Sequence, residues 1–245
     1  MSGVILFVIL GSLMLLVSML NNGTCRLEKV PKKTFDRPVC IAITGASSGI
    51  GLGMARILNE NHPQVKLIVT GRTKERAEAA VSTNGKRALL AASLDLDDSK
   101  SIDRFLEDLR LVVDNSCNGR LDYLFLNAGM IYAPGYNESY VSKDGLHDKL
   151  FSSNFIGHMR LLKGIIVSST GKTEHTRVIY VSSIAHFSVS INKDAVDPRI
   201  ILSRNDPVGE ILAYSRSKLA MTSMQQVLAK DGVVPNSVVV SRLPP

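Results

Sequence analysis

The feature that most constrains the fold is a glycine-rich string, Thr44–Gly51 (TGASSGIG), placed between two apolar segments. The segment before it, Val39–Thr44, is a short apolar run typical of a buried strand, and Ile50–Asn61 has apolar residues at helical spacing. A strand, a glycine turn and a helix N-terminus in this order present backbone N–H groups that can bind a pyrophosphate. The string therefore predicts a dinucleotide site within a βαβ unit.

From Val39 onward, strand-like and helix-like segments alternate. This alternation predicts an α/β fold, a Rossmann-type doubly wound parallel sheet with helices on both faces. The further predicted strands are Val65–Thr70, Arg87–Leu94, Leu121–Leu126, Arg177–Val181 and Ser237–Arg242. The further predicted helices are Thr73–Val81, Ser99–Val113, Leu146–Ser168 and Glu210–Lys230, and Ile184–Val208 is expected to be an irregular insertion.

The N-terminal region carries an apolar stretch, Val4–Leu20, of 17 residues. At about 1.5 Å per residue, this length is near the minimum for a hydrocarbon core of about 30 Å. We therefore expect a membrane anchor over residues 1–20 and a basic linker over 21–38. The positive-inside rule then places the domain 39–245 on the cytosolic side of a membrane, which we expect to be the endoplasmic reticulum.

A cleaved signal peptide is the alternative for the apolar stretch. No basic residue precedes Val4, which disfavours this alternative. Cleavage would yield a secreted soluble protein, whereas an uncleaved anchor in the expected orientation leaves the sequons at Asn22 and Asn137 unused.

Charge, cysteines and histidines restrict the classes of partner. The net charge is +7, but the basic residues are scattered and match no nucleic-acid motif, which favours membrane proximity over nucleic acid. The three cysteines, Cys25, Cys40 and Cys117, form no C-x-x-C pair, so we expect reduced thiols and no disulfide framework. The histidines do not fall at zinc spacing, and no metal site is predicted.

The end of the second predicted strand indicates which dinucleotide binds. An acidic residue there would bind the ribose 2′-hydroxyl and repel a 2′-phosphate. The strand instead runs into Gly71-Arg-Thr-Lys74, with two cations and no acid. Because the planar guanidinium of Arg72 suits a phosphate, the sequence predicts NADP(H).

A phenol and an ammonium lie four residues apart at Tyr214 and Lys218, and therefore on one helix face. A tyrosine of pKa about 10 is a poor acid–base group near neutrality. We expect the ammonium, together with the charge of an oxidised nicotinamide, to lower that pKa and to make Tyr214 a general acid/base. Val181-Ser182-Ser183 ends a preceding strand and could supply a hydroxyl that polarises the same carbonyl.

Taken together, these strings resemble the compact branch of the short-chain dehydrogenase/reductase superfamily, whose pattern is T-G-x-x-x-G-x-G, N-A-G, Ser and Y-x-x-x-K. The resemblance runs from Val39 to the C-terminus and implies hydride transfer. It implies that Tyr214 is the general acid/base, that Ser183 orients the carbonyl, and that Lys218 also binds the nicotinamide ribose. The choice of Ser183 over Ser182 rests on this resemblance.

The resemblance also implies roles outside the catalytic strings. Asn154 matches a helix asparagine that holds a proton-relay water, Asp95 matches the acid that bonds the adenine amino group, and Asn127 the residue that steadies the central strand. The implied cofactor-binding residues are Gly45, Ser47, Ser48, Gly49, Ile50, Gly51, Arg72, Asp95, Asn127, Ala128, Gly129, Tyr214 and Lys218.

Several segments are similar to lipid-handling members, namely Leu124–Met130, Asp144–Leu146, Asn154–His158 and the long gap between Ser183 and Tyr214. This similarity implies a lipophilic ketone or alcohol that reaches the site from the bilayer. A 3-keto steroid or sterol is favoured, and retinol or retinal is the alternative. Whether the protein forms a homo-oligomer is left open by the sequence.

The chain departs from the family pattern at Ser241–Pro245, where a Pro-Gly and a substrate-covering segment would follow. We therefore expect a C-terminally truncated domain with an incomplete substrate wall. This departure keeps a second hypothesis open, a catalytically weak dehydrogenase-like membrane protein that binds a partner or lipid.

Overall fold

The computed structural model describes residues 35–83, 88–132, 139–168, 176–190, 197, 199–201, 207–230 and 234–240. All of them belong to the second of two units of the chain, Phe35–Pro245. The predicted anchor, residues 21–34 of the linker and the departure at 241–245 lie outside the described residues. Within the described part of the chain, no helix has both the length and the apolar character needed to cross a bilayer.

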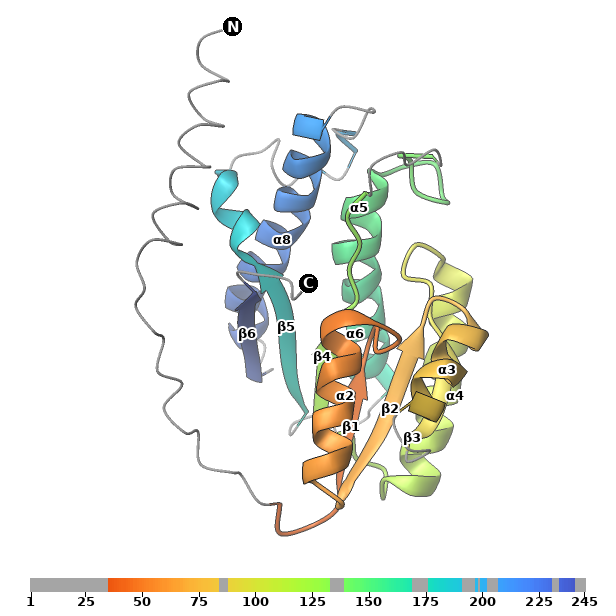
Figure 1. The fold of residues 1–245 in the computed structure, drawn as a ribbon. Coiled ribbons are helices and arrows are strands. Elements are labelled where there is room, and N and C mark those ends of the chain that lie inside the picture. The colour runs from red at the N-terminus through yellow and green to blue at the C-terminus, as the bar shows by residue number, and fades with distance from the viewer. Residues whose placement is uncertain are drawn as a thin grey trace, which may run out of the picture. The chain divides into compact units, whose positions relative to one another are not determined.

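The sheet contains six parallel strands in the order β3-β2-β1-β4-β5-β6 (Figure 1). The strands are β1 Val39–Ile43, β2 Val65–Gly71, β3 Ala88–Ser93, β4 Tyr123–Leu126, β5 Arg177–Ser183 and β6 Val234–Val240. The chain crosses from one half of the sheet to the other between β3 and β4, so β1 lies between β2 and β4. This is the switch point at which doubly wound folds bind ligands, and the predicted Rossmann-type sheet is confirmed.

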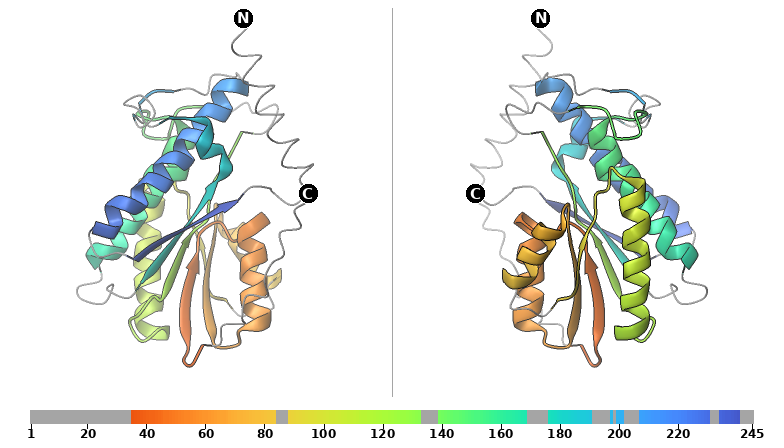
Figure 2. Two further views of the ribbon diagram at one scale, coloured as in Figure 1. Left: turned by 90° about the vertical axis from the view of Figure 1, so that its left-hand side faces the viewer. Right: turned by 90° about the vertical axis from the view of Figure 1, so that its right-hand side faces the viewer.

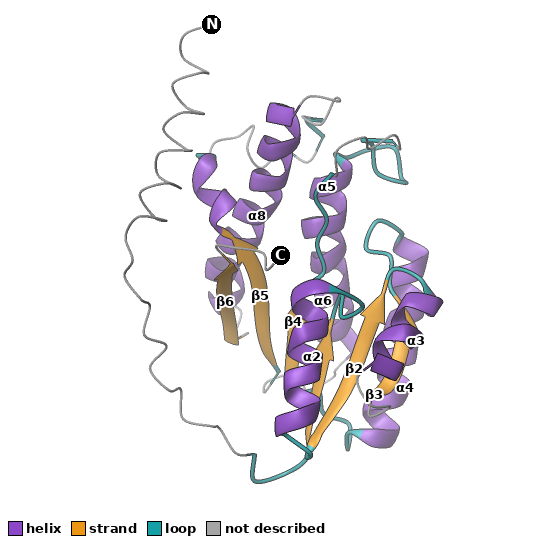
Figure 3. Ribbon diagram, in the orientation of Figure 1, coloured by secondary structure: helices purple, strands orange, loops and turns teal. Residues whose placement is uncertain are grey.

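Helices cover both faces of the sheet and alternate with the strands along the chain (Figures 2 and 3). Their bounds are α2 Gly49–Asn61, α3 Lys74–Thr83, α4 Ser99–Ser116, α5 Lys149–Phe151, the π-helical turn η1 Ser152–Ile156, α6 Gly157–Ser168, the 3-10 turn η2 Ile184–Ser188 and α8 Pro207–Lys230. Helices α2 and α3 pack on one face, and α4, α6 and α8 pack on the other.

Strand β1 shows why the core needs both layers. Cys40 and Ala42 pack with the α4, α6 and α8 side, whereas Val39, Ile41 and Ile43 pack with the α2 side. Each residue is at most 3% exposed. A central parallel strand is buried on both faces, and it therefore reads as a continuous apolar run.

Several boundaries differ from the sequence predictions: β6, for example, begins at Val234 and not at Ser237, and the starts of two helices have a local cause. The helix expected from Leu146 begins at Lys149, because the Asp148 carboxylate caps it by accepting hydrogen bonds from the amides of Leu150 (3.0 Å) and Phe151 (3.2 Å). The last helix begins at Pro207, a residue suited to a first helical turn.

The expectation of reduced thiols is wrong for two of the cysteines. Cys40 of β1 and Cys117, the C-cap of α4, are joined by a disulfide, with their Cα atoms 5.9 Å apart. They are 77 residues apart in the sequence, and only the packing of α4 on β1 brings them together. Cys25 lies outside the described residues.

Candidate active site

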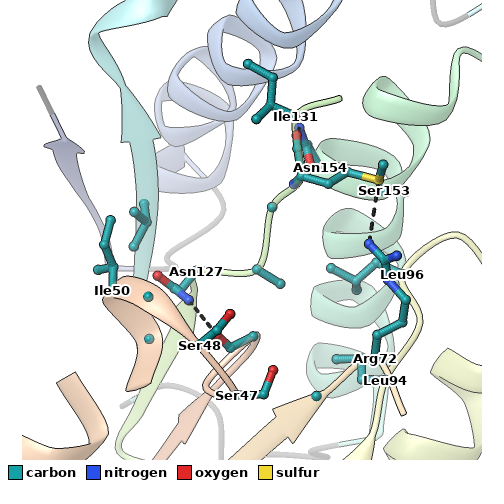
Figure 4. Close-up of a pocket in the computed structure, with 18 of the residues that line it drawn as sticks. Ser47, Ser48, Ile50, Arg72, Leu94, Leu96, Asn127, Ile131, Ser153 and Asn154 are labelled. Carbon is teal, nitrogen blue, oxygen red and sulfur yellow. Dashed lines mark hydrogen bonds between the residues drawn. The ribbon is translucent and has the colours of Figure 1, made fainter. Parts of the chain in front are cut away.

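A cavity of about 530 Å³ opens at the carboxyl ends of the central strands (Figure 4). Ser47 and Ser48 of the glycine loop line one side in this view, and Asn154 and Ile131 lie on the opposite side. The cavity brings together every residue that the sequence predicts for the site, namely Gly45, Ser47, Ser48, Gly49, Ile50, Gly51, Arg72, Asp95, Asn127, Ala128, Gly129, Asn154, Ser183, Tyr214 and Lys218. Their individual roles stay predictions.

The glycine loop has the backbone that its sequence requires. Gly45 has a φ of +65°, and a Cβ there would lie 2.8 Å from the Cα of Ala128. A Cβ at Gly51 would overlap the carbonyl oxygen of Gly45. Larger residues would therefore separate the loop from the N-A-G string, whereas glycine lets the N-terminus of α2 face the cavity.

Thr44 joins the glycine loop to the N-A-G string. Its hydroxyl oxygen accepts the amide protons of Asn127 and Ala128, both at 3.0 Å. The Asn127 side chain donates back to the carbonyl oxygens of Thr44 (2.9 Å) and Gly45 (3.2 Å). These hydrogen bonds join Asn127 to the end of β1 beside the cavity, and its role toward a cofactor stays a prediction.

Arg72 lies at the end of β2 and lines the cavity, with Nη2 3.8 Å from the sulfur of Met130 (Figure 4). Lys74, the other cation of this segment, instead lies on the surface within 3.8 Å of Glu78. Arg76 lines the cavity and was missed by sequence reasoning, although its place four residues after Arg72 on the following helix was a usable signal. Two guanidinium groups thus border the adenosine end of the predicted cradle.

Asp95 has a partner that the sequence did not reveal. The Lys143 ammonium lies 2.7 Å from one carboxylate oxygen of Asp95, and the amide of Asp97 donates to the other at 3.0 Å. Lys143 also lies 3.7 Å from Asp98. The segment around Lys143 is therefore tied to the end of β3, beside the position expected for adenine.

The structure distinguishes the two candidate serines. Ser182 lies 2.8 Å from the Thr222 hydroxyl and 3.3 Å from the Lys218 carbonyl oxygen, both on α8. Ser183 hydrogen-bonds the Tyr214 hydroxyl. Successive strand residues point to opposite sides, so only one serine can meet the phenol, and it is Ser183.

The electrostatics of Tyr214 differ from the expectation. Burial raises its pKa, and the hydrogen bond with Ser183 opposes that rise only in part. The Lys218 ammonium, which was expected to lower this pKa, donates to the carbonyl oxygen of Val181 at 3.0 Å and lies 5.7 Å from the Tyr214 ring centroid, and the net shift of the Tyr214 pKa is upward. Burial lowers the pKa of Lys218 to about 8. The contribution of a bound nicotinamide to the Tyr214 pKa stays a prediction.

Asn154 is fully buried in the π-helical turn η1. Its side chain accepts from the amide of Met130 (2.8 Å) and donates to the carbonyl oxygen of Met130 (2.9 Å) and to the Ser217 hydroxyl (3.0 Å). Ser217, inside the Y-x-x-x-K string, was missed as a site residue. Asn154 thereby links the N-A-G loop to the helix of the phenol, and the relay water stays a prediction.

Comparisons with known proteins agree with this architecture. A family model for short chain dehydrogenases matches residues 39–194. The human WW domain-containing oxidoreductase is 30% identical over 89% of this chain and 52% of its own length. Human retinol dehydrogenase 11 is 28% identical over 86% of this chain and 60% of its own length. The crystal structure of an uncharacterised protein from Mycobacterium paratuberculosis is 28% identical, with a TM-score of 0.62, over 85% of this chain and 69% of that one.

The chain thus spans a little over half the length of these two curated relatives. The site itself offers a phosphate cradle, two arginines at one end, and a half-buried serine–tyrosine pair beside a buried lysine at the other. This arrangement can hold a dinucleotide and exchange a proton with a carbonyl oxygen. The chain belongs to the short chain dehydrogenase family of oxidoreductases.

Proposed function

We propose that this protein is an NADP(H)-dependent oxidoreductase that interconverts a lipophilic ketone and its alcohol. The observation that carries the proposal is the hydrogen bond between Ser183 and Tyr214 at the end of the dinucleotide cradle. Binding a dinucleotide without turnover would not require the Ser183 and Tyr214 hydroxyls to meet beside that cradle.

The bound nicotinamide would supply hydride to the carbonyl carbon in the direction of reduction. Ser183 and Tyr214 hold the carbonyl oxygen, and Tyr214 gives it the proton, which yields the alcohol. In the reverse direction Tyr214 takes the proton back. Lys218, whose ammonium lies beside Gly129 and the Val181 carbonyl, is positioned to hold the nicotinamide ribose.

Arg72 and Arg76 support the choice of NADP(H) over NAD(H). Both line the cavity at the end of β2, where an acidic residue would favour NAD(H). The test is a titration of the full chain with NADPH and NADH. We expect NADPH to bind at least about tenfold more tightly, and Arg72→Ala to remove most of that preference. Equal affinities in the unmodified protein would contradict the choice.

A lipophilic substrate is supported by exposed apolar residues that lie close in the sequence to Ser183 and Tyr214. Ile184 (53% exposed) and Phe187 (77%) follow Ser183 on η2, and Ile211 (54%) precedes Tyr214 by one turn of α8. Exposed apolar residues on the elements that carry a site are consistent with contact to a lipid or a membrane. A 3-keto sterol is the first candidate and retinal the second, which the name of one relative favours.

Turnover separates these candidates. NADPH oxidation is measured with a 3-keto sterol and with retinal, using Ser183→Ala and, as its matched control, Ser182→Ala. We expect Ser183→Ala to lower kcat by about a hundredfold and Ser182→Ala to lower it by less than about tenfold. No oxidation with either substrate, despite NADPH binding, would favour a dehydrogenase-like protein that binds without turnover.

Membrane attachment through Val4–Leu20 and a location at the endoplasmic reticulum are also proposals. The positive-inside rule favours a cytosolic active site. The Cys40–Cys117 disulfide favours an oxidising compartment instead. Glycan occupancy at Asn137 in cells decides between them, because only a lumenal domain acquires that glycan.

A further inference from the structure

His158 is a fully buried histidine that sequence reasoning did not assign to the site. It lies on α6, four residues after Asn154. Its Nδ1 is 3.0 Å from the Asn154 carbonyl oxygen, and its Nε2 is 3.2 Å from the Thr44 hydroxyl. The ring therefore bridges the π-helical turn that holds Asn154 and the threonine that joins the glycine loop to the N-A-G string.

The groups around His158 determine where its proton lies. The Asn154 carbonyl oxygen can only accept, so Nδ1 must carry a proton. Nε2 of a neutral ring must then accept, and the donor within reach is the Thr44 hydroxyl. The lone pairs of that hydroxyl already receive the amides of Asn127 and Ala128.

The Thr44 proton has a second acceptor within reach, the Phe125 carbonyl oxygen at 3.2 Å. That carbonyl already accepts the Thr44 amide at 3.0 Å. Nε2 of His158 has no other donor among the described residues, so donation to the imidazole satisfies more buried groups. If Nε2 carried the proton, the Thr44 hydroxyl oxygen would face a third donor in addition to the amides of Asn127 and Ala128.

We propose that His158 is a positioning residue, a neutral imidazole with its proton on Nδ1, that holds the Thr44 junction and the Asn154 turn in one register. Thr44 positions the cofactor loop, and Asn154 connects to the helix of Tyr214 and Lys218 through Ser217. The inference rests on the proposed function, since the groups it positions are those of the proposed reaction.

The surroundings of His158 agree with a neutral ring. Burial lowers its pKa to about 4, the hydrogen bond to Asn154 opposes that change, and the charge of Lys218 adds to it. An imidazolium here would be a second buried cation near Lys218, without a carboxylate in contact among the described residues.

The first experiment needs neither cofactor nor turnover. Nitrogen-15 NMR of the histidine-labelled full chain at pH 7 identifies which ring nitrogen is protonated, and a His158→Gln spectrum assigns the signal. We expect the Nδ1–H tautomer. A ring protonated at Nε2, or at both nitrogens, would overturn the proposal even if the enzyme proves active.

Two variants then test the two contacts separately. The amide of His158→Asn can reach where Nδ1 lies and keep the bond to Asn154, whereas His158→Gln can reach where Nε2 lies and keep the bond to Thr44. We expect His158→Asn to weaken NADPH binding about fivefold, and His158→Gln to spare binding within about twofold but to lower kcat about fivefold. Equal changes in both constants for both variants would indicate a purely structural role and contradict the proposal.

The controls separate this proposal from the proposed function. Thr44→Val combined with His158→Asn should weaken NADPH binding no more than Thr44→Val alone. Thr44→Val already removes the hydrogen bond between the Thr44 hydroxyl and His158 that His158→Asn also removes. Additive losses would contradict the bridge. If NADPH binds but no ketone is reduced, the proposed function fails. The tautomer and the NADPH affinities of the variants still test whether His158 positions Thr44 and Asn154. If a variant does not fold, the tautomer of the unmodified chain decides.

Discussion

Buried charge is treated differently at the two ends of the sheet. At the amino end, the Asp122 carboxylate is 5% exposed and is paired with Arg37 and with Arg120, the latter at 2.7 Å. It also accepts the amide of Cys40 at 2.9 Å. At the carboxyl end, the Lys218 ammonium is similarly buried, but its described hydrogen-bond acceptor is a neutral carbonyl oxygen.

The pKa values follow this difference. Burial by itself would raise the pKa of Asp122, but the hydrogen bonds from Arg37 and Cys40 and the nearby charge of Arg120 hold it below 3.8. Burial lowers the pKa of Lys218 to about 8, and no carboxylate among the described residues is paired with its ammonium to oppose that shift. The amino end is thus built for stability, whereas the carboxyl end keeps a destabilising charge that the proposed chemistry needs.

The largest effect is expected at the carboxyl end, for Tyr214→Phe. Loss of the phenolic proton should lower kcat about a thousandfold, whereas NADPH affinity should stay within about twofold because the ring is kept. Steady-state oxidation of NADPH and a binding titration measure the two constants. Unchanged turnover would show that Tyr214 at the carboxyl end of the sheet is not catalytic.

Reduction of the disulfide should give the next largest effect, at the amino end. Cys40 and Cys117 close a loop across 77 residues. Opening it should lower the free energy of unfolding by about 3 kcal/mol. Urea denaturation with and without reductant measures the change, and Cys25→Ser serves as the control. Three alkylatable thiols in the native, unreduced chain would refute the bond.

Asp122→Asn should lower the free energy of unfolding by about 2 kcal/mol at pH 7, because two arginines lose their carboxylate. The folded pKa of Asp122 lies below 3.8, so this contribution is present above that pH and is lost as the pH falls below it. The difference in free energy of unfolding between the unmodified protein and Asp122→Asn should therefore become smaller in acid. Asp103→Asn, at an exposed pair with Arg160, should change stability by less than about 0.5 kcal/mol.

Lys218→Met should change the free energy of unfolding less than Asp122→Asn does, and with the opposite sign. Removing the buried ammonium should raise the free energy of unfolding by about 1 kcal/mol at pH 7, while turnover is lost. The folded pKa is about 8 and the unfolded value is 10.5. The unmodified protein should therefore gain stability as the pH rises from about 8 to 10.5, and the advantage of the variant should shrink. If Lys218→Met is less stable than the unmodified protein at pH 7, the buried ammonium does not destabilise the fold.

Local patterns were enough to predict the architecture and part of the site, namely the glycine loop, Arg72, Tyr214 and Lys218, whereas Asp95, Asn127, Asn154 and the choice of Ser183 came from the family resemblance. A glycine turn between a strand and a helix has few uses, and β1 is apolar because both of its faces are buried. Periodicity located every strand and long helix because burial repeats with the geometry of each element. The lining of the cavity follows, because the carboxyl ends of parallel strands meet at one edge of the sheet.

Contacts between distant segments could not be read in this way. Spacing does not reveal that Cys40 faces Cys117, that Lys143 meets Asp95, or that His158 reaches Thr44, since each pair depends on how a helix or loop packs against the sheet. The pKa of Tyr214 shows the same limit: its distance in sequence from Lys218 set the expectation, but burial governs the result. Residue types and their order select the chemistry, whereas desolvation and hydrogen-bond partners depend on three-dimensional packing.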